Sequence, residues 1–197
     1  MEMFMEYPLE YFIMLLVIVG SSVGAIFILK IDWRGYGLLF ILSGIVGNII
    51  CILFVVLNFY SFPVVPFHFG IHMPYTAILI AFPYYVLLGV RFSPRHWYLK
   101  IPFYWAFVHI GVLAEKLMEE YTSIIEYGFY WDTFDSYATW WVYLLVFEFI
   151  GGKLVSDDKR RPIQTRAFWY GRWAWFSVHF ILIITIFLAG VYVGTLL

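Results

Sequence analysis

Residues 98–155 read YLKIPFYWAFVHIGVLAEKLMEEYTSIIEYGFYWDTFDSYATWWVYLLVFEFIGGKLV and hold the densest set of ionisable side chains within otherwise apolar sequence. An ionisable group at membrane depth is costly unless it is paired, solvated or used. The stretch predicts two membrane helices, at about 99–120 and 137–155, joined by an acidic segment. We therefore expect the functional groups of the protein to lie in this part of the chain.

The composition of the whole chain is that of an integral membrane protein. Of its 197 residues, 63% are hydrophobic and 13% are charged, whereas about 25% of the residues of a soluble domain are charged. The net charge of −1 and the lack of a clustered basic face argue against a nucleic-acid partner and leave the lipid bilayer as the expected one. Cys51 is the only cysteine, so no internal disulfide forms. The acidic residues before the first apolar run, with no cleavage site after it, predict that the first helix is retained.

Apolar runs of roughly 20 residues predict helices that cross a bilayer. The expected fold is all-α: a polytopic membrane protein whose six transmembrane helices form one bundle over residues 1–197. The expected helices are 10–29, 36–58, 73–91, 99–120, 137–155 and 173–196. Gly20 and Gly24 in the first helix, and Gly190 and Gly194 in the last, stand one turn apart and predict close helix packing, with a dedicated dimerisation face as the alternative. Gly44 and Gly47 in the second helix form a small flat patch. Asn48 beside them is expected to bond a neighbouring helix, with a ligand as the alternative.

The basic residues predict the orientation of the bundle. If six helices alternate in direction, all the basic residues except Lys116 fall at or beside one end, and Lys and Arg accumulate on the cytoplasmic side. These are Lys30, Arg34, Arg91, Arg95, Lys100 and the basic residues of 153–172. We therefore expect a multi-pass protein of the cell membrane with both termini outside.

Ionisable groups inside the predicted helices are the candidate ligand-binding or proton-relay residues. They are His109, Glu115, Glu148 and His179. Glu148 and His179 lie at similar depths on consecutive helices, so we expect them to be neighbours in a structural hydrogen bond, a proton relay or a metal half-site. His109 and His179 at similar depth leave haem as an alternative. Near the outer end, Lys116 is expected to pair with Glu120, four residues on.

A second candidate site lies on the predicted outer surface. His68 and His72 stand four residues apart, the spacing at which two histidines on one helical turn share a divalent ion. Glu119, Glu120 or Glu126 supply an oxygen ligand in this hypothesis, and such a mixed set suits zinc or iron. The alternative is a pair of interfacial histidines that bond water and lipid headgroups.

One resemblance spans roughly residues 30–175. The order of Pro66-x-His68, Pro83, Pro94, Ile125-Glu126-Tyr127, Tyr130-Trp131 and Ser136 resembles a family of small, uncharacterised multi-helix membrane proteins from spore-forming Gram-positive bacteria. The resemblance implies a bacterial cell membrane and adds weight to His68 and Glu126. It implies no activity or cofactor, and His72 lies outside the shared pattern.

The sequence contains none of the spacings that mark metalloproteases, di-iron bundles, phosphate-binding loops or serine hydrolases. With 23% aromatic residues, it favours a binding or accessory component for a partner protein, a lipid or an apolar ligand, or a homo-oligomer. The alternatives are an intramembrane enzyme that uses a divalent metal or haem, and a small transporter subunit that uses the buried His and Glu groups.

Overall fold

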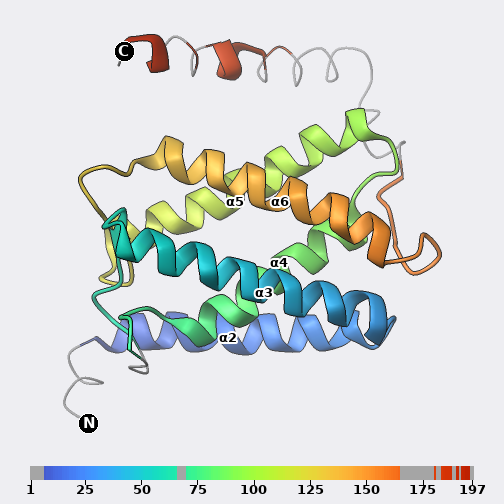
Figure 1. Cartoon of the computed structure of the whole chain (residues 1–197), viewed down its shortest axis with the longest axis horizontal. Helices are drawn as coiled ribbons and strands as arrows, with labels where there is room; N and C mark the ends of the chain where they lie inside the picture. The colour runs from blue at the N-terminus through green and yellow to red at the C-terminus, as the bar shows by residue number, and fades with distance from the viewer. Residues whose placement is uncertain are drawn as a thin grey trace. The chain divides into compact units, whose positions relative to one another are not determined.

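The computed structural model describes residues 7–65 and 70–164 and, further on, residues 180, 183–187, 190 and 192–195. Its elements are α2 (Pro8–Leu29), α3 (Trp33–Val56), β1 (Tyr60–Ser61), α4 (Tyr75–Phe92), α5 (Trp97–Tyr121), β2 (Glu126–Tyr127) and α6 (Thr133–Leu154) (Figure 1). The strands are two residues long each, so the expected all-α class is confirmed for the described chain.

The helices begin where local sequence favours it, within a few residues of the expected bounds. Asp32 precedes α3, and its carboxylate accepts hydrogen bonds from the backbone N–H groups of Arg34 and Gly35. Asp132 precedes α6 and forms a reciprocal capping box with Asp135. Such caps satisfy backbone donors that the first helical turn leaves free.

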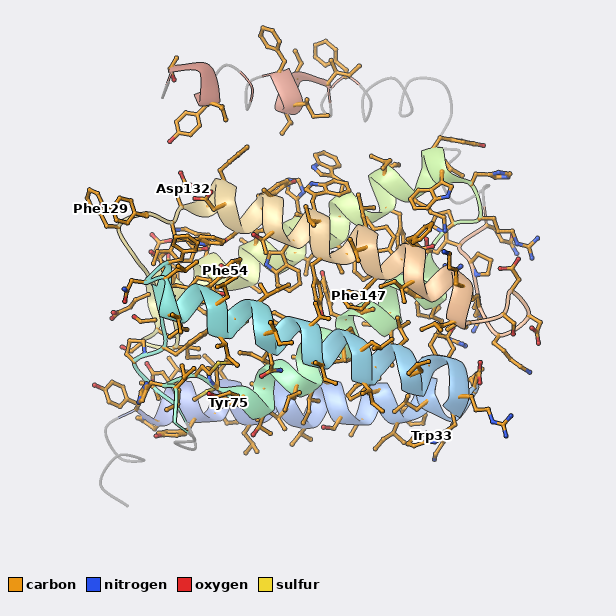
Figure 2. All side chains as sticks on the ribbon, viewed as in Figure 1. Trp33, Phe54, Tyr75, Phe129, Asp132 and Phe147 are labelled. Atoms are coloured by element: carbon orange, nitrogen blue, oxygen red, sulfur yellow. The ribbon has the colours of Figure 1, made fainter. Side chains whose placement is uncertain are left out.

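Connections gather at the two ends of the bundle. At one end β1 pairs antiparallel with β2, and the backbone N–H of Ser123 donates to Glu10 Oε1 over 3.2 Å. We call this the acidic end. At the other, the basic end, the backbone N–H of Arg161 donates to the carbonyl of Arg91 over 2.8 Å. Successive helices therefore alternate in direction; Figure 2 shows Phe54 and Asp132 at the acidic end and Trp33 at the opposite end.

Glycines let the helices approach closely. A Cβ atom added at Gly24 of α2 meets the ring of Tyr84 on α4 at 2.4 Å, whereas one at Gly20 meets nothing within 4 Å. Of the two expected contact glycines of α2, only Gly24 therefore makes a close approach. Phe147 lies between α3 and α6 and is 2% exposed (Figure 2).

Three of the described helices are long and apolar enough to cross a membrane. They are Pro8–Leu29, Trp33–Val56 and Tyr75–Phe92. Their outward faces carry exposed apolar side chains, such as Phe12, Phe27 and Ile49. Soluble monomers rarely expose apolar surface on this scale, so the faces support membrane association. Helices α5 and α6 carry most of the interior ionisable groups and fall outside this set of three.

The C-terminal segment Ile163–Leu197 is a separate unit. Residues 183–187 and 192–195 are helical and lie within the expected helix 173–196. His179 and the rest of that prediction lie outside the described residues.

Candidate functional site

An apolar cavity of about 420 Å³ lies among α2, α4 and α5. Its walls are almost entirely hydrocarbon and aromatic, and include Ile13, Met14, Val17, Ala77, Ala81, Leu88, Ile110, Ala114 and Met118. Pro74 and Ile124 line it near the acidic end. Ligand-binding cavities in proteins have this volume and are mostly apolar, with a few polar groups that orient the ligand.

The cavity arises because α4 and α5 meet closely only toward the basic end. There Tyr104 packs against Gly89, where an added Cβ would lie 2.9 Å from its ring. One turn further into the bundle, the Tyr85 hydroxyl donates to the backbone carbonyl of Phe107 over 2.7 Å. Toward the acidic end, side chains of α2 and the segment after α5 line the space between the two helices.

Glu115 supplies the charged group of the cavity wall. Its Oε1 accepts hydrogen bonds from the Tyr127 hydroxyl (3.0 Å) and the Ser136 hydroxyl (2.6 Å). Its Oε2 accepts one from the indole N–H of Trp140 (2.9 Å). All three donors are neutral, and no ion pair among the described residues involves Glu115. The carboxylate therefore fastens α5 to β2 and α6 while its charge has no cation within ion-pair distance.

Glu115 also lines a small cavity of about 40 Å³. Glu115, Cys51, Tyr60, Phe82 and Trp140 line both cavities. The volume is enough for a water molecule, and the polar groups around it provide hydrogen-bond partners. Glu115 thus contributes a carboxylate to the walls of both cavities, which suits a ligand with an apolar body and one polar group.

At the basic end, Glu148 is the centre of a buried ionic cluster. Its Oε1 accepts from Lys100 Nζ and from the guanidinium of Arg160 (2.7 Å), and its Oε2 accepts from the Tyr104 hydroxyl (2.6 Å). Lys100 also donates to the Ser93 hydroxyl over 3.1 Å. Glu148 is 2% and Lys100 5% exposed. The sequence predicts Lys100 only as a basic residue at the membrane border, and it predicts His179, which lies outside the described residues, as the neighbour of Glu148.

His109 and Asn48 belong neither to the hydrogen bonds around Glu115 nor to the ionic cluster around Glu148. The His109 ring is exposed; its Nδ1 lies 2.9 Å from the Trp105 carbonyl and 2.7 Å from the Tyr137 hydroxyl. Asn48 donates to the Gly44 carbonyl of its own helix, not to a neighbouring helix as expected, and its buried side-chain oxygen has no partner among the described residues.

The expected metal ligands are in part outside the described residues. His68 is one of these; His72 Nδ1 lies 2.7 Å from the Phe62 carbonyl. Lys116 forms an ion pair with Glu119, three residues on, at 2.5 Å. The expected pair with Glu120 is not formed. Glu126 lies in β2 and is exposed. Among the residues described, no three His, Cys, Asp or Glu side chains form a group that could hold a metal ion, and the two-histidine hypothesis stays a prediction.

The hydrogen-bond partners of Glu148 and of Glu115 were not predicted, although the spacing of residues in the sequence indicates both sets. Lys100 and Tyr104 stand four apart on one face of a helix, and Lys100 is close enough to the start of its helix to reach Glu148 near the end of the next. Ser136 and Trp140 repeat that spacing on α6, where both donate to Glu115.

Comparisons with protein-family models, with curated proteins and with solved structures found no match.

Proposed function

We propose that this protein is a membrane-embedded binding protein that takes an apolar molecule, a lipid or another ligand with a long hydrocarbon part, into the cavity among α2, α4 and α5. The observation that carries the proposal is the cavity itself, which has a volume of about 420 Å³ and apolar walls. Its one carboxylate, Glu115, is held in place by three hydrogen-bond donors. Apolar walls supply affinity through burial. A single fixed polar group supplies orientation and selectivity.

We propose that α5, α6 and the C-terminal segment each cross the membrane, as the three most apolar helices can, which makes a six-helix multi-pass protein of the cell membrane. Two observations support this arrangement. The helices α2 to α6 alternate in direction, and the basic residues of their connections gather at one end. With that end cytoplasmic, both termini lie outside. A topology reporter fused after Leu197 should therefore be active only outside, and a cytoplasmic signal overturns this orientation.

The test of binding compares two alanine substitutions on α5. Ala114 and Ala106 are both exposed alanines of α5, but only Ala114 lines the cavity. In Ala114→Phe the added ring occupies cavity volume; Ala106→Phe adds the same ring outside it and serves as the matched control.

Wild-type protein extracted in mild detergent should carry a stoichiometric apolar molecule that native mass spectrometry detects. Ala114→Phe should lose most of that occupancy while Ala106→Phe retains it. A wild-type protein with no bound molecule, or equal occupancy in both variants, contradicts the proposal.

A further inference from the structure

A third cavity, of about 110 Å³, lies at the basic end, between the turn after α4 and the segment after α6. Its walls include Ser93, Arg95, Lys100 and Arg160, with Asp157 the only carboxylate among the residues that line it. Nothing in the proposed function uses this cavity. Its polar, cationic walls contrast with the hydrocarbon walls of the large cavity.

The charges of the buried cluster beside this cavity do not cancel. Lys100 and Arg160 share one oxygen of one carboxylate, Glu148, so two cations face a single negative charge. The side chains of all three are at most 9% exposed. A buried charge is stable only when it is paired and hydrogen-bonded, so this cluster has room for one more anionic partner.

The two cations also have unused donors. A lysine ammonium has three N–H donors and an arginine guanidinium five. Lys100 uses two, toward Ser93 and Glu148. Arg160 donates through Nε to the Val90 carbonyl and through one terminal nitrogen to Glu148. Lys100 Nζ also lies 5.5 Å from the centre of the Trp97 ring. Both side chains line the cavity, so we expect their remaining donors to be available to a ligand there.

The connections around this cavity add further positive charge. Basic residues outnumber acidic ones in the connections at this end, and in the proposed orientation these connections face the anionic inner leaflet. Phosphate oxygens accept several hydrogen bonds at once from arginine and lysine side chains, which makes phosphate the anion that fits such a donor set.

We propose that this cavity binds a phosphate group, with Lys100, Arg160 and Arg95 as its ligands. The group comes either from an anionic phospholipid headgroup or from a free phosphate compound. The competing role for the site is a purely structural one, in which Asp157 supplies the missing negative charge from the cavity wall.

The experiment measures the thermal midpoint of the full-length protein in detergent as three probes are added at constant ionic strength: inorganic phosphate, short-chain phosphatidic acid and short-chain phosphatidylcholine. A ligand that binds the folded protein raises the midpoint, and the stabilisation grows with the logarithm of one plus the ratio of ligand concentration to dissociation constant. A shift with phosphatidic acid alone identifies a lipid headgroup site, and a shift with inorganic phosphate identifies a site for free phosphate. No shift with either, or an equal shift with phosphatidylcholine, overturns the proposal.

Exposed residues provide variants that leave the buried cluster intact. Arg95→Gln should weaken phosphate binding roughly tenfold, whereas Arg34→Gln, an exposed arginine on α3 that does not line the cavity, should leave it unchanged. Asp157→Asn should tighten binding by removing a repulsive charge, with Asp158→Asn as its neighbouring control. If Asp157 instead completes the cluster, Asp157→Asn lowers the midpoint without ligand and does not tighten binding, and the structural role is correct.

Discussion

The substitution Glu148→Gln tests the ionic cluster at the basic end directly. Glutamine has nearly the volume of glutamate, so the change removes the charge and leaves the packing. Lys100 and Arg160 then remain buried without their shared counter-ion. Breaking a buried ion pair by removing one partner destabilises a protein by about 3–5 kcal/mol, because the partner left behind is an unpaired buried charge. For a chain of this size that corresponds to a fall of about 6–20 °C in the thermal midpoint.

The assay is unfolding in mixed micelles of mild detergent and SDS, followed by far-ultraviolet circular dichroism, with the thermal midpoint as the second readout. The matched control is Glu120→Gln on the exposed end of α5, which should change the free energy of unfolding by less than about 0.5 kcal/mol.

A double variant separates the ion pair from a general effect of the substitution. Lys100→Met added to Glu148→Gln removes one of the two stranded cations, so the double variant should be more stable than the sum of the single effects predicts, by at least about 1 kcal/mol. Strict additivity, or a loss below about 1 kcal/mol in Glu148→Gln alone, would show that the cluster is not buried and coupled.

Three further predictions concern the rest of the bundle. Glu115→Gln should lower the free energy of unfolding by about 1–3 kcal/mol, since an amide nitrogen cannot accept the hydrogen bonds that one carboxylate oxygen accepts; an effect no larger than that of Glu120→Gln contradicts the role given to Glu115. Gly24→Leu should lower the thermal midpoint while Gly20→Leu leaves it nearly unchanged, because only the first meets an aromatic ring of α4; equal effects argue against the helix contact. Burial, and then the neighbouring Glu115 carboxylate, raise the pKa of the Tyr127 phenol above its ordinary value of 10.0. Since the folded state then holds this proton more tightly than the unfolded state, stability should fall as the pH rises above about 10, and an unchanged alkaline loss of stability in Tyr127→Phe refutes this contribution.

The helices were predictable from the sequence because their signals are local. Runs of apolar residues of the right length predicted the bounds of α2 to α6 to within a few residues. Because successive helices alternate in direction, the order of the helices also predicted at which end of the bundle each connection lies. Cys51, which stands in an apolar run of the sequence, is buried. The loop between α3 and α4 is apolar in sequence, and Val64 and Met73 are buried there.

The partners of the polar groups were decided only by the tertiary structure. Which carboxylate meets which cation depends on the rotation of each helix about its axis and on the register between neighbours, and these are set by side-chain packing along the whole interface. Lys100 at the start of α5 and Arg160 beyond α6 converge on Glu148 although 48 residues separate the first pair and 12 the second. Likewise the apolar cavity exists because Tyr104 and Tyr85 hold α4 and α5 together at one end only, and the hydropathy of a chain contains no information about such a divergence. The sequence by itself therefore determined the helices and the ends at which their charges gather, whereas packing between helices decided which of those charges form sites.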